Sequence, residues 1–344
     1  MRAICKTGPG PGAKLCKVDD PRPAADELLV RVRRASICGS DMAIYHWNSW
    51  APNRFPAPMV FGHEFCGEVV EAGSATRDFA KGDFVSVESH VYCGLCYQCR
   101  NGQRHVCQRL KIIGVDCPGG FAELARVPAR CAWKHPDESI AEIGSLMEPL
   151  GNAVYATLIE EVVGRSVVVL GCGPQGLFAI AVAKASGAKP IIAVEGAPYR
   201  RRLATRMGAD VLIDPASADP ARGVLTAAGP GGADVVLEMS GSPAAISLGL
   251  KVLRSGGRLT AFGIPPGTLA IDWASDVVFK GIRIYGVAGR EIFQTWYTTE
   301  RLLRTGAIDV RPVITHVFPA KDYERAFKTM ASKDKRCGKV VLEF

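Results

Sequence analysis

The hydrophobic pattern of the chain changes character near residue 165. Before that point, short runs at residues 28–32, 68–71 and 84–87 combine apolar and β-branched residues and are bounded by turn-forming residues. Such runs are typical of β-strands separated by turns. The first part of the chain therefore predicts a mostly β domain.

Beyond residue 165, apolar runs alternate with helical patterns. Residues 166–170 form a continuous apolar run, as expected of a strand buried on both faces, and residues 177–186 form an Ala-rich helical segment. Further strands are predicted at residues 190–195, 211–213, 234–238, 258–263 and 283–287, with helices at 200–207 and 243–253. Regular alternation of this kind predicts a doubly wound parallel sheet, so the fold class is α/β.

The last fifty residues depart from this alternation. Residues 291–304 and 323–330 have helical patterns, and residues 339–344 resemble a closing strand. We expect this tail to return to the first domain. The predicted organisation is a domain of residues 1–150 completed by residues 293–344, and a second domain of residues 151–292.

A glycine-rich loop joins the first predicted strand and helix of the second domain. It has the form Gly171-x-Gly173-x-Gln175-Gly176. The first glycine permits a tight turn, the second lets the backbone approach a pyrophosphate, and the third lets strand and helix pack closely. Free N–H groups at the helix N-terminus then face the phosphates. The loop predicts a dinucleotide site.

The type of dinucleotide depends on charges near the second strand. Glu195 lies 24 residues beyond Gly171 and can accept hydrogen bonds from ribose hydroxyls, which favours NAD because a carboxylate repels a 2′-phosphate. By contrast, three arginines favour NADP because they could hold that phosphate: Arg200, Arg201 and Arg202. They could equally form a solvated helix face. We expect NAD.

Four cysteines lie within fifteen residues, at Cys93, Cys96, Cys99 and Cys107. Four thiolates complete the tetrahedral shell of a zinc ion and leave no open position, so the spacing predicts a structural site. A zinc ribbon that binds nucleic acid would need a second Cys-x-x-Cys pair farther on, and the chain has none.

A second potential metal site is dispersed along the chain. Cys38, His63, Glu64 and Glu148 offer one thiolate, one imidazole and two carboxylates, which could hold a zinc ion with one replaceable position. Spacing alone does not separate this interpretation from that of unrelated structural residues.

Composition narrows the function classes. The chain has 344 residues, a net charge of +8 and scattered basic residues, a pattern that argues against nucleic-acid binding. No apolar run reaches the length of about 18 residues that a membrane span needs. We expect a cytoplasmic protein, in which the twelve cysteines stay reduced and some of them bind metal.

The chain resembles the zinc-containing medium-chain alcohol dehydrogenases over essentially its whole length. The residues that carry the resemblance are Gly62-His63-Glu64, the four-cysteine lobe, Glu148-Pro149 and the Gly171 loop. Within that family it most resembles the threonine dehydrogenases, through residues 37–41, 147–154, 289–297 and 312–316. The resemblance implies a GroES-like catalytic domain, a Rossmann coenzyme domain, NAD, one catalytic and one structural zinc, and a homodimer or homotetramer.

The resemblance also implies roles for individual residues. Cys38, His63 and Glu64 would hold the catalytic zinc, and Glu148 would be a fourth ligand or part of the proton path. Ser40 would carry the proton and His90 would lie near the substrate. Glu195 and Arg200 would bind the adenosine half of NAD. The nicotinamide side would be lined by Phe262, Gly263, Ile264, Gly286 and Val287.

One departure bears on the substrate. Threonine dehydrogenases oxidise the β-hydroxyl of threonine to give 2-amino-3-oxobutanoate and carry a relay histidine three residues after a threonine. Here Ser40 keeps the hydroxyl, but Ala43 replaces the histidine. His46 could substitute or could be a surface residue. The alternatives are a polyol or other secondary-alcohol dehydrogenase on the same scaffold, and a zinc-free reductase or non-catalytic NAD-binding protein, against which the intact Cys38, His63 and Glu64 set argues.

Overall fold

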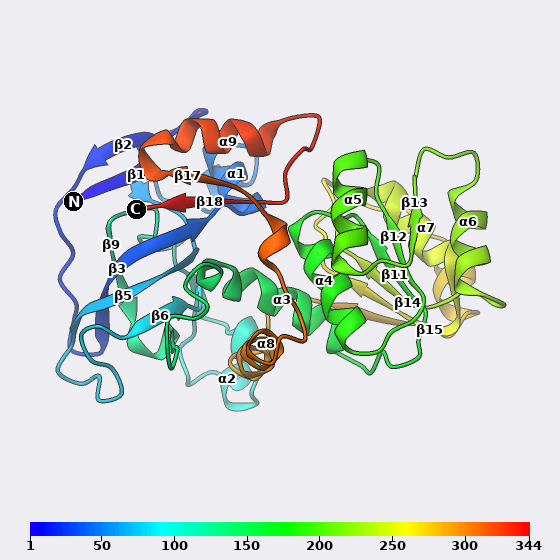
Figure 1. Cartoon of the computed structure of the whole chain (residues 1–344), viewed down its shortest axis with the longest axis horizontal. Helices are drawn as coiled ribbons and strands as arrows, with labels where there is room; N and C mark the ends of the chain where they lie inside the picture. The colour runs from blue at the N-terminus through cyan, green and yellow to red at the C-terminus, as the bar shows by residue number, and fades with distance from the viewer. The chain divides into compact units, whose positions relative to one another are not determined.

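The computed structural model describes all 344 residues and divides into two compact units. Unit 1 comprises residues 1–149, 314–333 and 339–344, and unit 2 comprises residues 150–313 and 334–338. Both ends of the chain lie in unit 1 (Figure 1). None of the helices combines the length and the apolar character that crossing a membrane requires.

Unit 1 is built mainly from antiparallel strands. Its largest sheet has the order β10-β6-β5-β3-β18-β17, with β9 paired to β3, beside a β2-β1-β4 sheet and a β7-β8 pair. Its elements are β1 Arg2–Lys6, β2 Lys14–Lys17, β3 Glu27–Ser36, α1 Gly39–His46, β4 Met59–Val60, β5 Glu64–Ala72, β6 Phe84–Val87, β7 His90–Val91, α2 Tyr97–Arg100, β8 Lys111–Ile112, β9 Leu124–Pro128, β10 Ala132–Lys134, β17 Ile314–Pro319, α9 Tyr323–Ala331 and β18 Lys339–Glu343.

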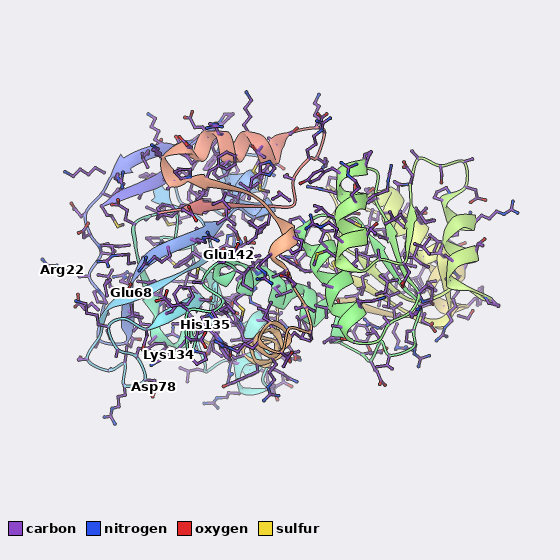
Figure 2. The ribbon with its side chains drawn as sticks, viewed as in Figure 1. Arg22, Glu68, Asp78, Lys134, His135 and Glu142 are labelled. Atoms are coloured by element: carbon purple, nitrogen blue, oxygen red, sulfur yellow. The ribbon has the colours of Figure 1, made fainter.

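Side-chain bonds reinforce the edge of the large sheet. Figure 2 shows Lys134 and His135 at the end of β10. The His135 ring nitrogen Nε2 lies 2.8 Å from Ser86 Oγ, and Lys134 Nζ lies 2.7 Å from a carboxylate oxygen of Asp83. The first contact joins the residue after β10 to β6. The second joins β10 to Asp83, the residue before β6.

Unit 2 is a six-stranded parallel sheet of order β13-β12-β11-β14-β15-β16. Helices α4 and α5 pack together on one face and α6 and α7 on the other (Figure 1). Its elements are β11 Val167–Leu170, α4 Pro174–Ala185, β12 Ile191–Val194, α5 Pro198–Met207, β13 Val211–Ile213, α6 Pro220–Ala228, β14 Ala233–Glu238, α7 Pro243–Val252, β15 Leu253–Ala261, β16 Arg283–Gly286 and α8 Gln294–Arg304, while α3 Met147–Leu158 spans the boundary between the units.

The α/β fold class and the doubly wound sheet are confirmed. The second unit extends to Val313, however, so that α8 belongs to it, whereas the sequence interpretation ended that domain at residue 292. A helical hydrophobic pattern indicates that one face is buried, but it does not indicate which core receives that face.

Candidate active site and metal centres

The first group of potential metal ligands lies where β5 begins and α1 begins. Cys38 immediately precedes α1, and His63 and Glu64 lie at the start of β5. Gly62, just before them, has φ of +90°, and a Cβ there would lie 2.4 Å from the Phe121 ring, so glycine is required. This turn delivers His63 and Glu64 to one place. The ligand atoms of Cys38, His63 and Glu64 all lie within 4.8 Å of one another.

Asp41 sets the orientation of this group. Its Oδ1 atom lies 3.2 Å from His63 Nδ1, and its Oδ2 atom accepts a hydrogen bond of 2.8 Å from the Cys38 N–H. Burial alone would lower the pKa of His63, but the charges of Asp41 and Cys38 raise it well above its ordinary value. The group therefore attracts positive charge. A thiolate, an imidazole fixed by a carboxylate, and a nearby second carboxylate fit a zinc ion.

Glu64 has other partners besides this group. Its Oε1 and Oε2 atoms lie 2.7 Å and 2.5 Å from Lys339 Nζ, and the Ser36 hydroxyl donates to Oε2. All three side chains are almost fully buried. Burial raises the pKa of Glu64, although Lys339 and His63 act in the opposite direction. Glu64 is thus available to a metal only in competition with a buried cation.

Glu148 lies near the group but outside it. It occupies the first turn of α3, and its Oε1 atom accepts a 2.7 Å hydrogen bond from Ser89 Oγ. Its charge is among those that raise the pKa of Glu64. It is not among the residues whose ligand atoms lie within 4.8 Å of one another. Its role as a ligand or a proton carrier stays a prediction.

Buried Glu88 contacts the partly buried His90, on the other side of Ser89 in the chain. Glu88 Oε1 accepts a hydrogen bond from the His90 backbone N–H at 2.8 Å and lies 3.1 Å from its ring Nδ1. The His90 ring is therefore held on one nitrogen by a carboxylate, which orients the other nitrogen. Its proximity to substrate stays a prediction.

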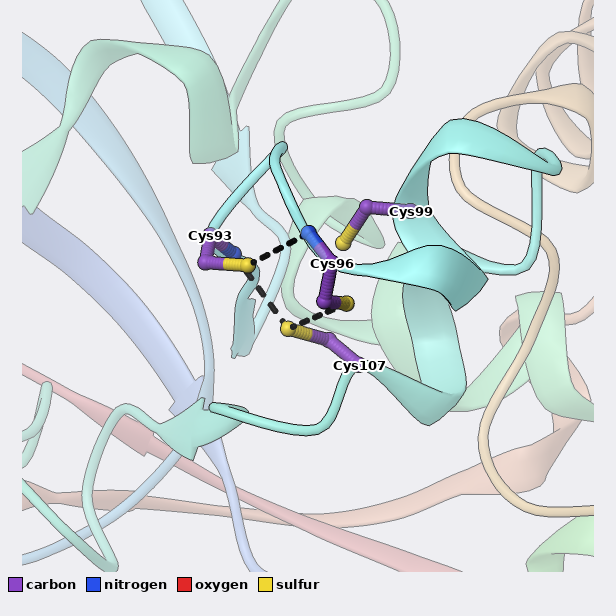
Figure 3. A group of neighbouring side chains, drawn as sticks. All are labelled: Cys93, Cys96, Cys99 and Cys107. Carbon is purple, nitrogen blue, oxygen red and sulfur yellow. Dashed lines mark hydrogen bonds between the residues drawn. The ribbon is translucent and has the colours of Figure 1, made fainter.

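The four-cysteine lobe forms the second group of ligands (Figure 3). The thiols of Cys93, Cys96, Cys99 and Cys107 lie within 4.8 Å of one another, and Cys96 Sγ is 3.7 Å from Cys107 Sγ. Backbone N–H groups of Leu95 and Cys96 point at Cys93 Sγ at 3.4 Å and lower the pKa of this thiol to about 6. Donors that favour a thiolate also favour a metal, so the lobe fits a structural zinc.

The glycine loop lies at the carboxyl end of β11, the central strand of the sheet in unit 2. Gly171 has φ of +89°, and a Cβ at Gly176 would lie 2.0 Å from the Gly171 carbonyl oxygen. Cys172 and Gly173 complete the turn before α4. The loop has the close approach of strand and helix that dinucleotide binding needs.

Glu195 and the three arginines occupy the end of the adjacent strand. Glu195 accepts backbone hydrogen bonds of 2.8 Å from Cys172 and Ala197. Arg201 binds Asp214 at 2.8 Å and Arg202 lies over the Tyr199 ring. Arg200 donates to the Cys337 carbonyl at 3.1 Å and approaches Gly173, where its Nη1 would lie 3.9 Å from a Cβ. Arg200 therefore lies beside the glycine loop.

The residues expected on the nicotinamide side also follow strand ends. Phe262, Gly263 and Ile264 follow β15, and Gly286 and Val287 close β16. The carboxyl ends of parallel strands form the ligand-binding edge of such sheets, and β11 and β12 end at the same edge. The predicted coenzyme residues thus share one edge, although their contacts with coenzyme stay predictions.

The residues expected in the proton relay lie on α1. Ser40 and Ala43 are half-buried, whereas His46 is exposed in the last turn. His46 lies six positions after Ser40, a rotation of about 600° that places the two side chains about 120° apart around the helix. The geometry favours the interpretation of His46 as a surface residue.

Three residues with evident roles had no place among the sequence predictions. Asp41 orients His63, Ser89 binds Glu148, and Lys339 binds Glu64. Asp41 carried a local signal, since it follows Cys38 by three residues, as in a capping box. Lys339 carried none, because 275 residues separate it from Glu64.

Known families match both parts of the chain. The alcohol dehydrogenase GroES-like domain family matches residues 24–137, and the zinc-binding dehydrogenase family matches residues 174–305.

Individual proteins match nearly the full length. The L-threonine 3-dehydrogenase of Pyrococcus horikoshii is 47% identical over 343 residues, covering 99% of this chain and 98% of that protein. A Sinorhizobium meliloti protein described as a zinc-binding dehydrogenase, bound to NADP, has a TM-score of 0.92 at 30% identity, with 100% of this chain and 99% of that one covered. The 2R,3R-butanediol dehydrogenase of Bacillus subtilis has a TM-score of 0.89 at 26% identity, with 100% and 99% covered.

Proposed function

The chain belongs to the zinc-containing alcohol dehydrogenase family, and on that premise we propose that it oxidises the β-hydroxyl of L-threonine with NAD. The products are 2-amino-3-oxobutanoate, NADH and a proton. One observation carries the proposal: the clustered side chains of Cys38, His63 and Glu64 belong to a chain that matches an L-threonine 3-dehydrogenase over 99% of its length.

The chain's own residues prepare the reaction. When bound by Cys38 and His63, zinc supplies a Lewis acid that lowers the pKa of the substrate hydroxyl. Asp41 fixes the His63 ring for that contact. Ser40 accepts the hydroxyl proton and passes it toward solvent, and Ser89 keeps Glu148 directed at the same region. The Gly171 loop and Glu195 would hold the coenzyme, which would supply the oxidant by accepting a hydride from the substrate carbon.

We assign NAD rather than NADP as the coenzyme. The Glu195 carboxylate lies at the end of β12 beside the glycine loop, where the ribose of a dinucleotide binds in such sheets. Arg201 and Arg202 have partners within the chain, so they do not supply a ready phosphate site. The NADP in the Sinorhizobium meliloti neighbour makes this choice worth measuring.

A second candidate substrate class is a polyol or another secondary alcohol. Ala43 favours it, since threonine dehydrogenases carry a relay histidine at that position, and His46 is exposed. The similarity to a butanediol dehydrogenase is compatible with the same alternative at lower sequence identity.

Steady-state turnover tests the proposal. NADH formation is measured with L-threonine and NAD, with and without a chelator, and compared with sorbitol and 2,3-butanediol. We expect chelator-sensitive turnover with threonine. Turnover with only sorbitol or 2,3-butanediol would overturn the threonine assignment in favour of the second substrate class. Turnover that the chelator does not inhibit would contradict the catalytic zinc.

We further propose that the protein is a homo-oligomer, a dimer or a tetramer, and that it works in the cytoplasm. Strand β16 is the last strand of its sheet, and large apolar side chains on it or in the twenty residues before it are exposed: Ile264, Trp273, Val278, Phe279 and Ile284. An edge strand with such surroundings suits pairing with a second copy across a twofold axis. All twelve cysteines are free, which suits a reducing compartment.

Light scattering tests the oligomer. Phe279→Asp should place a charge in the proposed interface and lower the molar mass of the oligomer, with an unchanged circular dichroism spectrum. The matched control is Val163→Asp, an exposed apolar residue elsewhere in unit 2. A Phe279→Asp protein of unchanged mass would count against this surface.

A further inference from the structure

Lys339 is a buried lysine whose ammonium group reaches the first metal-ligand group. It begins β18, which pairs with β17 at Ile314 and with β3 through Val341 and Ser36. The side chain is 3% exposed, and its Nζ atom lies within 2.7 Å of both oxygens of Glu64. Pairing on both sides fixes the strand, so the ammonium group is held at the carboxylate.

Glu64 differs in this respect from the other two members of the group. The contact between Asp41 and His63 leaves the second ring nitrogen of His63 for a metal. Glu64, by contrast, has both oxygens engaged by a cation and one of them also by the Ser36 hydroxyl. A metal at this group must therefore share Glu64 with Lys339.

A carboxylate that already has an alternative partner is a replaceable ligand. A buried carboxylate that leaves a metal ordinarily becomes an unpaired buried charge, which is strongly unfavourable. Lys339 and Ser36 remove that penalty, because they satisfy Glu64 whether or not it contacts the metal. The ammonium charge also reduces the electron donation of Glu64.

We propose that Lys339 is a positioning residue that makes Glu64 a detachable ligand of the catalytic zinc. Lys339 keeps its contact with the carboxylate whether or not Glu64 binds the metal. Glu64 can therefore leave the metal and free a coordination position when substrate arrives. The inference rests on the catalytic zinc of the proposed function, but not on threonine as the substrate.

The test compares the zinc affinity of Lys339→Met with that of the unaltered protein. Zinc transfer to a chromophoric chelator is followed without substrate, and the catalytic ion is recognised as the one missing in Cys38→Ser. We expect Lys339→Met to hold this zinc at least about tenfold more tightly, because Glu64 loses its competitor. Turnover at saturating substrate should fall, because the ligand no longer leaves readily.

A purely structural ion pair predicts the opposite sign. If Lys339 only stabilised the fold, its removal would loosen Glu64 and His63 and weaken zinc binding. Unchanged or weaker zinc binding in a folded Lys339→Met protein would therefore overturn the proposal. The matched control is Lys6→Met, a second buried lysine of unit 1 whose ammonium group binds the carbonyls of Gly12 and Tyr45. It should lower stability and leave the catalytic zinc unaffected.

A second variant covers the case in which Lys339→Met does not fold. Lys339→Arg keeps the charge and adds a fork that binds both carboxylate oxygens more firmly. It should release the catalytic zinc faster, and release at an unchanged or slower rate would count against the proposal. Because the zinc measurements use no substrate, a wrong substrate assignment would leave them unaffected.

Discussion

The Nδ1 atom of His63 lies 3.2 Å from Oδ1 of Asp41, a residue 22 positions earlier in the chain. Asp41 also accepts the backbone N–H of Cys38, so one carboxylate organises the histidine and the loop that carries the thiol. Neither Asp41 nor His63 is appreciably exposed. The arrangement of the three potential ligands thus depends on a residue that is not itself among them.

Replacing Asp41 with Asn should weaken the catalytic zinc. The amide oxygen can still accept the Cys38 N–H, but the charge that orients His63 is lost, and such losses typically cost about 10- to 100-fold in metal affinity. Chelator competition measures the effect. Asp219→Asn, which alters a helix cap at Arg222, is the control and should leave zinc binding unchanged. Equal affinity for Asp41→Asn would show that His63 needs no such partner.

Cys96→Ser should remove the structural zinc and loosen the lobe. The zinc content measured by metal analysis should fall from two ions per chain to one. The lobe should become sensitive to protease because the metal organises it. Cys16→Ser, a half-buried thiol outside both groups, should keep both ions. A Cys96→Ser protein with two zinc ions and unchanged thermal stability would contradict the structural site.

Glu195→Gln should weaken the binding of NAD and shift the coenzyme preference toward NADP. The substitution removes the charge that repels a 2′-phosphate, and we expect KM for NAD to rise by about tenfold. Initial rates with both coenzymes give the ratio of kcat/KM values. Glu300→Gln on α8 neutralises a carboxylate elsewhere in unit 2 and serves as control. An unaltered coenzyme ratio would exclude Glu195 from the ribose site.

Ser40→Ala and His46→Ala should behave differently. Loss of the Ser40 hydroxyl should lower kcat by about 100-fold, the usual scale for a proton-transfer group. His46 is exposed at the far end of α1, so its replacement should change kcat by less than about twofold. A comparable loss in both variants would instead make His46 the substitute for the histidine missing at Ala43.

Asp234→Asn should destabilise the protein in a pH-dependent way. Burial would raise the pKa of Asp234, but hydrogen bonds from Ser166 and Arg254 hold it below the ordinary value of 3.8. Because the pKa is lower in the folded state, ionised Asp234 stabilises the fold at pH values above its ordinary pKa of 3.8. This stabilisation is lost as the pH falls through the folded-state pKa. The variant should lose about 1–3 kcal/mol at neutral pH and progressively less below pH 3.8 in denaturant melts. A difference that did not vary with pH would contradict the ionic contribution.

Several features could be predicted because their residues are neighbours in the chain. Cys93, Cys96, Cys99 and Cys107 lie within fifteen residues, so local geometry nearly suffices to bring their thiols together. The Gly171 loop sits between a strand and a helix whose patterns are visible in the sequence, and the structure has that strand and helix. Short-range periodicity and spacing determine such features.

Other features were decided by the tertiary structure alone. The pairing of β18 with β3 brings Lys339 to Glu64, and nothing in the residues around either side chain indicates it. The membership of α8 in unit 2 likewise depends on which core receives its apolar face. The sequence by itself determined the fold class and the donor types of both groups of potential metal ligands, since these follow from local pattern and chemistry. Packing decided which buried charges share the Glu64 carboxylate, because strand pairing joins residues that are distant in the chain.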